Sequence, residues 1–276
     1  MTNWNIKEIL KFLKEAGNIA LDIQKRDEWD FKEDHSLVTE ADKTIEDMAR
    51  KRFISEGAYF IGEETILTDS EEDIQNAIKG PTWILDPVDG TAPFANGLPT
   101  WGVSLGFMEE GKLTEGAIAF PGLDLTVYTN EGTTYIIEGD QEPRPLTVST
   151  SDFNEGRMLC IPQDVTKWGV FTGDTPVQVT GSCVYSMLQL LLGRYSSYFS
   201  RAKVWDIGAG WPILRTAGVK AYFYNGEETD LLLEPKDFVL DVDSPKRWRT
   251  QYHVIYANNE QARAYMNEHI KLKDEV

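Results

Sequence analysis

A short apolar strand that runs straight into two aspartates is the feature that most constrains this chain. Residues 82–85 read as a buried strand. Six residues follow it without a spacer: Asp86, Pro87, Val88, Asp89, Gly90 and Thr91. Because Pro87 has no N–H to donate to a neighbouring strand, we expect the strand to end soon after Asp86. Segments that leave a buried sheet commonly form functional sites, so the fold must bring these acids to a sheet edge.

The spacing of these residues suits a hard divalent cation. Asp86 and Asp89 lie three apart around a proline-led turn, so their carboxylates can converge while the Val88 carbonyl faces the same point. Carboxylates, a backbone carbonyl and waters are the ligands that such cations take. Gly90 allows close backbone approach, and if Thr91 caps a short helix, the free N–H groups there can hold a phosphate. Each residue alone could be a simple turn residue, but the linked set favours a site.

Composition narrows the range of partners. The chain has 276 residues, and 27 Lys plus Arg against 45 Asp plus Glu give a net charge of −18. A polyanion would be repelled, so we expect no nucleic-acid partner, and an anionic substrate requires bound cations that invert the local charge. No stretch approaches the roughly 18 apolar residues of a membrane span. Two cysteines and an opening segment that mixes Lys with Glu predict a cytoplasmic protein. The three histidines form no zinc-ligand pattern.

The chain reads as two halves packed as one unit. The polar, proline-bearing stretch 139–145 is the best boundary, which gives an α+β half over 1–140 and an α/β half over 141–276. The first half would carry most of the acids, and the second would complete the site.

Apolar residues at helical spacing predict helices over 6–23, 39–53, 182–192 and 207–217. Thr39 and Asp42 resemble a capping box at the second of these helices. Pro212 should kink the fourth helix, and Asn258 should cap a terminal helix. The acidic run 69–73 reads as solvated acid.

Two familiar motifs are better explained as strand and turn. Residues 106–112 match most of a phosphate-binding P-loop, but Leu113 stands where the Ser or Thr for magnesium belongs. The alternating strand before it favours a hairpin turn. Residues 102–106 spell the nucleophile elbow of serine hydrolases, yet Ser104 falls inside that strand rather than on a strand-to-helix turn.

Two further acidic segments, Gly62-Glu63-Glu64 and Trp205-Asp206, complete a pattern that resembles the inositol monophosphatase family of metal-dependent, lithium-sensitive sugar phosphatases. Five segments carry the resemblance, in the family's order and close to its spacing: 37–42, 60–64, 83–91, 181–182 and 204–206. They span nearly the whole chain. The resemblance implies a five-layered αβαβα sandwich, magnesium dependence and phosphomonoester hydrolysis, commonly in a homodimer.

The same resemblance implies a role for each matching residue. The expected metal ligands are Glu63, Asp86, the Val88 carbonyl, Asp89 and Asp206. The residues expected to orient and activate the attacking water are Asp42 and Thr91, with Glu63 beside them. Gly90 and Thr91 would hold the phosphate. Glu64 would contact the metal ligands without binding the metal itself. The expected substrate contacts are Asp89, Gly181, Ser182 and Arg201. The metal would be two or three Mg²⁺ ions, with Mn²⁺ able to replace them.

Residue by residue, simpler roles compete with these. From composition alone, Asp42 reads as a first-turn acid that complements the helix dipole. Asp206 reads as the N-cap of a helix that begins at Ile207, although a capping carboxylate can also bind a metal.

The chain departs from the family at the substrate end. Ser200 stands where the family's inositol-reading Glu is expected, and Arg201 follows it with a connection one residue short. Arg201 favours a second phosphate or a carboxylate, which puts inositol monophosphate itself in doubt. A surface charge in a loop accounts for Arg201 equally well. After Thr91, Ala92 and Pro93 replace the usual residues, and Pro93 removes one N–H that could bind phosphate.

The sequence therefore predicts a magnesium-dependent phosphomonoesterase that acts on a small sugar, inositol or nucleotide phosphate through metal-activated water. Fructose 1,6-bisphosphate and an adenosine bisphosphate are alternative substrates for the same chemistry. Asp86 acting as a covalent nucleophile is a second mechanism. A non-catalytic, metal-binding regulatory homologue is the alternative of another class, and the presence of every expected ligand together with Thr91 argues against it.

Overall fold

The structure is a computed structural model that describes residues 4–26, 30–31, 37–38, 40–54, 57–66, 70–148, 153 and 156–272, with the backbone alone for 30–31 and 37–38. Thr39, the expected capping residue of the second helix, lies outside the described residues.

A seven-stranded sheet forms the first β layer, and its strands are neighbours in chain order: β3 (Tyr59–Gly62), β4 (Thr82–Asp89), β5 (Gly102–Glu109), β6 (Lys112–Phe120), β7 (Leu125–Asn130), β8 (Thr133–Glu138) and β9 (Arg144–Pro145). β3 and β4 run parallel, and the other pairs are antiparallel. Successive residues of β4 face opposite sides of the sheet. Trp83 and Leu85 join one hydrophobic core, and Ile84 joins the other.

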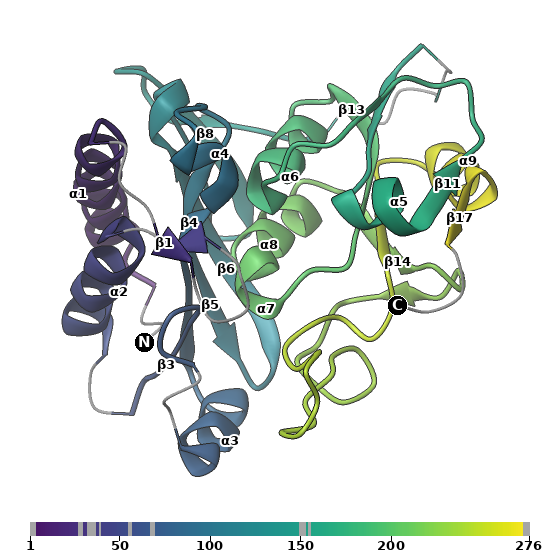
Figure 1. The fold of residues 1–276 in the computed structure, drawn as a ribbon. Helices are drawn as coiled ribbons and strands as arrows, with labels where there is room; N and C mark the ends of the chain where they lie inside the picture. Colours follow the sequence, from purple (N-terminus) through teal and green to yellow (C-terminus); the bar gives the residue numbers. More distant parts are fainter. Residues whose placement is uncertain are drawn as a thin grey trace.

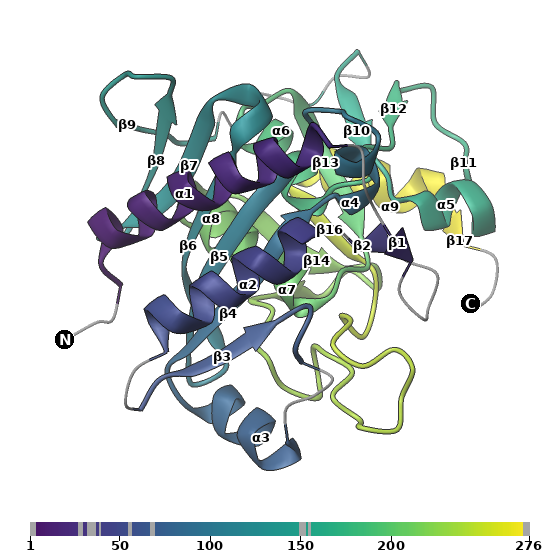
Figure 2. The same ribbon diagram turned by 60° about the vertical axis from the view of Figure 1, so that its left-hand side comes forward.

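Helices cover both faces of this sheet (Figures 1 and 2). α1 (Ile6–Gln24) and α2 (Glu40–Phe53) lie on one face and match the predicted helices in type and extent. On the other face lie α6 (Cys183–Leu191), α7 (Val204–Ile207) and α8 (Gly210–Thr216). α6 also packs against β13 of the second sheet, and Trp211 of α8 contacts Tyr256 of β16. α7 shares the apolar cluster of these two helices, so the three form the middle layer of the molecule.

The second sheet has six strands in the order β12 (Val177–Gln178), β10 (Met158–Cys160), β13 (Tyr195–Ser200), β16 (Val254–Ala257), β14 (Lys220–Phe223) and β15 (Glu228–Thr229). α5 (Gln163–Trp168) and α9 (Glu260–His269) pack on its outer face through a third apolar cluster that includes Val165, Phe199 and Met266. The layers in Figure 1 are therefore helix, sheet, helix, sheet and helix, which confirms the expected αβαβα sandwich.

The smaller elements are β1 (Asp30–Phe31), β2 (Leu37–Val38), α3 (Glu71–Lys79), α4 (Thr91–Ala95), the 3₁₀ turn η1 (Pro121–Leu123), β11 (Gly169–Phe171) and β17 (Ile270–Leu272). The sequence reading missed α3. The Ser70 hydroxyl accepts the Asp73 N–H at 3.2 Å, and the acids at 71–73 occupy the first turn of α3. Negative charge in that position complements the helix dipole. These three acids are exposed to solvent, as the sequence predicts, and Asp69 lies outside the described residues.

Three predicted boundaries were wrong, each for a local reason. β4 does not end after Asp86 but continues through Pro87 to Asp89. The register with β5 shifts between Asp86 and Asp89, so the missing N–H of Pro87 falls where the ladder is already interrupted. The helix predicted over 207–217 is two helices, α7 and α8. Pro212 lies in the first turn of α8, where its N–H is not needed.

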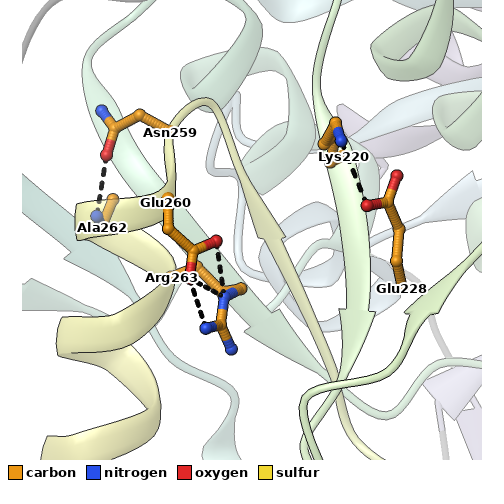
Figure 3. A network of polar contacts seen from close by, with 6 residues as sticks. All are labelled: Lys220, Glu228, Asn259, Glu260, Ala262 and Arg263. Atoms are coloured by element: carbon orange, nitrogen blue, oxygen red, sulfur yellow. Dashed lines mark hydrogen bonds and ion pairs between the residues drawn. The ribbon is translucent and has the colours of Figure 1, made fainter.

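The third wrong boundary is the cap of the last helix. Asn259, not Asn258, caps α9, because its side chain accepts the Ala262 N–H at 2.8 Å (Figure 3). Figure 3 also shows two exposed ion pairs nearby, Glu260 with Arg263 on α9 and Lys220 with Glu228 across β14 and β15. Water screens exposed pairs of this kind, so they contribute little to holding the second sheet together.

The two rejected motifs have the predicted structures. Residues 106–112 run from β5 into β6 through a tight turn in which Gly111 has a φ of 76°, and Ser104 is buried within β5. The seven-stranded sheet lies within 59–145 and the six-stranded sheet within 158–257. The division of the chain at residue 140 stays a prediction. Among the described helices, none is both long enough and apolar enough to cross a membrane.

Candidate active site

Three aspartates converge where the first sheet meets the middle helices. Asp86 and Asp89 come from the end of β4, and Asp206 comes from α7. Each offers a carboxylate oxygen, and these three oxygens lie within 4.8 Å of one another. Asp86 is 2% exposed and Asp89 is 4% exposed, while Asp206 is partly exposed. The fold thus brings Asp206 next to two aspartates that lie more than a hundred residues earlier in the sequence.

The end of β4 is shaped by its own hydrogen bonds. The Val88 N–H donates to Asp86 Oδ1 at 3.1 Å, and the Thr91 hydroxyl donates to the Val88 carbonyl oxygen at 3.2 Å. The sequence suggested Thr91 as the cap of a short helix, but Thr91 does not cap α4. Gly90 holds the N-cap position with a φ of 94°, and Thr91 is the first helical residue. Gly90 suits this left-handed conformation because it has no Cβ.

The start of α6 fixes Asp89. The Ser182 hydroxyl and the Val184 N–H both donate to Asp89 Oδ1, the second at 3.2 Å. Ser182 also caps α6 by accepting the Tyr185 N–H at 3.1 Å. A Cβ on Gly90 would come within 2.8 Å of Ser182 Cβ, so the two turns pack directly together. The structure therefore brings Ser182 to Asp89, and Gly181 lies beside it with a φ of 77°.

Asp206 is placed by a hydrogen bond in the first turn of α7 and by the packing of that helix on the sheet. Asp206 Oδ2 accepts the Lys203 N–H at 2.8 Å from the third position of α7, so the predicted N-cap role was wrong. α7 ends at Ile207, and the carbonyl of Gly208, its C-cap, occupies the space that a Cβ on Gly106 would need. The Ala209 carbonyl does the same at Gly116. These two glycines are cross-strand partners in β5 and β6. They let the α7–α8 junction lie directly on the sheet.

The remaining acids border the three aspartates. The Glu63 N–H donates to the Leu85 carbonyl at 3.3 Å, which places Glu63 beside the end of β4. Asp42 is 1% exposed on α2. Both Glu63 and Asp42 are close enough to raise the pKa of Asp86. The family resemblance predicts roles for Glu63 and Asp42 but not for Glu46. Glu46 is a buried carboxylate on α2 that accepts the Glu64 N–H at 2.9 Å.

A signal for Glu46 was present in the sequence. Asp42 and Glu46 are four residues apart in a predicted helix, so both lie on one face, and the apolar residues on either side show that this face is buried. Two acids on a buried helix face require partners.

Arg201 has a structural role that the sequence did not suggest. Its guanidinium donates to the carbonyl oxygens of Thr250 and Gln251, from Nε at 3.3 Å and from Nη2 at 3.0 Å. These bonds join the end of β13 to the segment that precedes β16. A substrate contact by Arg201 stays a prediction.

Burial and mutual repulsion make the cluster reluctant to carry its full negative charge. Burial raises the pKa of Asp86 well above its usual value. The negative charges of nearby acids raise it further: Glu63, Asp89, Asp206 and Asp42. Burial and the Asp206 charge do the same to the pKa of Asp89, against the opposing hydrogen bond from Ser182. Burial and Glu63 raise the pKa of Asp206 to about 6, although the Lys203 N–H bond and the charges of Lys203 and Arg249 oppose the rise.

The donor set fits a hard divalent cation. All the converging groups are oxygens, and three carboxylates within 4.8 Å of one another in a largely buried position would be relieved by positive charge. Asp86, Asp89 and Asp206 could hold such an ion together, and Glu63 is close enough to act on the charge of Asp86.

Comparisons with known proteins identify phosphatases among the relatives of this chain. The chain is 29% identical over 201 residues to a fructose-1,6-bisphosphatase/inositol-1-monophosphatase of Thermotoga maritima, covering 70% of this chain and 74% of that protein. It is 29% identical over 238 residues to a histidinol-phosphatase of Chlorobaculum parvum, covering 80% and 86%. The solved structure of an inositol monophosphatase from Thermotoga maritima superposes with a TM-score of 0.68 at 23% identity, covering 95% of this chain and 96% of that one.

A sequence model described as the inositol monophosphatase family matches residues 5–271, almost the full length of this chain. The chain therefore belongs to the inositol monophosphatase family of phosphatases.

Proposed function

We propose that this protein hydrolyses a small phosphate monoester in a Mg²⁺-dependent reaction with water as the nucleophile. The observation that carries the proposal is the convergence of Asp86, Asp89 and Asp206 carboxylate oxygens within 4.8 Å. A chain with a net charge of −18 could not otherwise accept an anionic substrate beside buried acids. We further propose that the protein acts as a homodimer in the cytoplasm.

Each residue near the cluster has a proposed task. The groups that would hold the metal are Glu63, Asp86, Asp89, Asp206 and the Val88 carbonyl. Two or three Mg²⁺ ions, or Mn²⁺ in their place, would neutralise the phosphate and make water a better nucleophile. Asp42 and Thr91 would orient that water and receive its proton, with Glu63 beside them. Gly90 and Thr91 would bind the phosphate, and Gly181 and Ser182 would border the leaving group.

The covalent alternative has less support. Asp86 Oδ1 is engaged by the Val88 N–H, and its carboxylate belongs to the crowded cluster rather than standing apart to attack phosphorus. A regulatory protein without turnover would not need the Thr91 hydroxyl, which lies 3.2 Å from the Val88 carbonyl oxygen.

Measurement of phosphate release tests the proposal. Asp206→Asn should abolish most release with MgCl₂, because it removes one of the three converging carboxylates. Thr91→Ala should lower turnover by about 10²–10⁴-fold, the scale of assisted proton transfer. Asp164→Asn, a change of the same charge on α5, is the control. Near-normal release by Asp206→Asn would sink the assignment, and a stable phosphoenzyme would favour the Asp86 mechanism.

A second anionic group on the substrate is favoured by one further observation. Lys203 and Arg249 are paired in an isolated antiparallel bridge next to Asp206, and neither forms an ion pair with a carboxylate in the described part of the chain. Like charges placed opposite each other repel, and Asp206 supplies one negative charge against these two positive ones. Buried Ser200 meanwhile offers no carboxylate for sugar hydroxyls. We therefore propose a bisphosphate, such as a fructose or adenosine bisphosphate, ahead of inositol monophosphate.

A substrate panel separates these choices. Lys203→Met and Arg249→Met should each weaken the use of bisphosphates by roughly 1.5–3 kcal/mol in kcat/KM, the scale of a hydrogen bond to a charged group. Simple monophosphates should be spared. Arg201→Ala should share the effect if Arg201 also contacts the substrate. Arg263→Met, on exposed α9, is the control. Equal losses on both substrate classes would remove the second-anion proposal.

A further inference from the structure

A buried carboxylate on α2, outside the cluster of aspartates, accepts several hydrogen bonds from a single loop. Glu46 is 1% exposed, and its side chain accepts the Glu64 N–H at 2.9 Å and the Thr65 N–H at 3.1 Å. The Thr65 hydroxyl donates to the same carboxylate. Two consecutive backbone N–H groups and a hydroxyl therefore enclose one side chain. Both oxygens of the Glu46 carboxylate therefore have donors from the same loop, Oε2 from Glu64 and Oε1 from Thr65.

The backbone is shaped around this carboxylate. A Cβ on Gly62 would overlap the Glu46 carboxylate, so glycine is the residue that lets the loop close over it. The loop returns on itself when the Ile66 N–H donates to the Gly62 carbonyl at 3.1 Å. The Gly62-Glu63-Glu64 sequence, first noted for its acids, thus also encodes the space that Glu46 fills.

A cation completes the arrangement. Arg50, one turn further along α2, places Nε 3.5 Å from Glu46 Oε1 and also donates to the Thr65 hydroxyl. The Arg50 guanidinium lies 4.7 Å from the centre of the Phe60 ring, which belongs to β3. The charge of Glu46 is therefore balanced locally, so a buried carboxylate is tolerated.

The position of Glu46 relates it to the proposed reaction. Asp42 is one turn earlier on the same helix, and Glu63 directly precedes Glu64 in the loop. Glu46 therefore ties the helix that carries Asp42 to the loop that carries Glu63. Replacing its carboxylate would remove three of the hydrogen bonds that join this loop to α2, while the bond from Arg50 to the Thr65 hydroxyl would remain.

We propose that Glu46 is a positioning residue that sets the place of Glu63 at the metal site through the Glu64 and Thr65 N–H groups. The inference rests on the proposed metal-dependent function, but it concerns the affinity for the metal rather than the identity of the substrate. Glu46 does not touch the substrate. Residues that hold metal ligands from behind commonly change metal affinity by 10–100-fold when they are replaced.

Calorimetric titration of EDTA-stripped protein with MgCl₂ tests the proposal without any substrate. Glu46→Gln keeps the size of the side chain but turns an NH₂ toward one of the backbone N–H donors, so it should weaken Mg²⁺ binding about tenfold. Thr65→Ala leaves both backbone bonds and should weaken it by only about threefold. The control is Asp47→Asn, which removes the same charge from an exposed position on α2 and should change the affinity less than twofold.

Turnover then separates positioning from general damage. At saturating Mg²⁺, Glu46→Gln should regain kcat to within about threefold, while the Mg²⁺ concentration for half-maximal rate stays raised. A purely structural role predicts a lower melting temperature in EDTA with unchanged Mg²⁺ affinity, and that result would overturn the proposal. If Glu46→Gln does not fold, Thr65→Ala decides the question by the same titration.

The two proposals fail in different ways. A parent protein that binds Mg²⁺ but releases no phosphate from any ester would refute the proposed function and leave the role of Glu46 intact. The second outcome is normal phosphate release by the parent, with equal Mg²⁺ affinities for Glu46→Gln, Thr65→Ala and Asp47→Asn. It would refute the role of Glu46 and leave the proposed function intact.

Discussion

The acids of the site are supported on two sides by different kinds of contact. On one side, which we call the polar support, Glu46 holds the Glu63 loop by hydrogen bonds from Glu64 and Thr65. On the other, the glycine support, the cross-strand pair Gly106 and Gly116 lets the α7–α8 junction lie on the sheet, which places Asp206. Donors and acceptors can be replaced one at a time, whereas a backbone contact at a glycine leaves no room for another atom. Single substitutions can therefore weaken the polar support by different amounts, whereas any added side chain disrupts the glycine support.

The largest expected effect comes from filling the glycine support. Gly116→Ala would drive a Cβ into the Ala209 carbonyl, and neither backbone can move without shifting its sheet or helix. We expect a loss of about 3 kcal/mol in the free energy of unfolding, at the upper end for overpacked sites, together with weaker Mg²⁺ binding. Urea denaturation and Mg²⁺ calorimetry would measure the two effects.

The control for this prediction is Gly132→Ala, at the tip of the β7–β8 turn. Nothing lies within 4 Å of a Cβ there, so only its φ of 73° should cost stability, by about 1 kcal/mol. Glu46→Gln supplies the contrast, since it should lower Mg²⁺ affinity with a smaller loss of stability. If Gly116→Ala were as stable as Gly132→Ala, the two supports would not differ in the way described.

A smaller effect should appear in the pH dependence of stability without metal. The pKa of Asp206 is raised to about 6 in the folded protein, against about 3.9 in an unfolded chain. Below about pH 4 this carboxyl is protonated in both states. As the pH rises toward 6, the unfolded chain ionises first, so the free energy of unfolding should fall by on the order of 2 kcal/mol for this group.

The measurement has to separate this carboxyl from His253. Burial, aided by the charge of Arg201, lowers the pKa of His253 to about 4, so His253 adds stability as the pH rises through the same range. The difference between the parent and Asp206→Asn isolates the aspartate: in EDTA the variant should lose less stability between pH 4 and 6. Saturating Mg²⁺ should offset the loss in the parent, by about 2.7 kcal/mol at a hundredfold excess over its dissociation constant. Parallel curves for the two proteins would contradict the crowding of charge at Asp206.

Local signals were enough for much of the fold. Helix α1 follows from its apolar spacing, and Ser182 caps α6 where the predicted helix begins. Each of these features depends on residues within a few positions of one another. The wrong boundaries depended on neighbours that were distant in the sequence: Pro87 is tolerated within β4 because of the register shift against β5.

The candidate site likewise has parts that the sequence predicts and parts that it does not. The resemblance supplied Asp86, Asp89 and Asp206, and the structure brings their carboxylates together. The two supports could not be predicted, because each depends on a distant partner. Gly106 and Gly116 read only as parts of a hairpin until the α7–α8 junction was seen to rest on them, more than ninety residues further along the chain. Glu46 had a local signal, but its partners in the loop did not.

The strand order of the two sheets has a consequence for how the site comes into being. In the seven-stranded sheet every strand lies beside its neighbour in sequence, whereas the six-stranded sheet interleaves strands from across the second half of the chain. Pairings between nearby segments close short loops and form early, and pairings between remote segments form late. We therefore expect Asp86 to reach its place in the early part of folding. Asp206, and the α6 donors that fix Asp89, should arrive with the late part. We therefore expect tight metal binding only in the fully folded chain, where all three aspartates have been brought together.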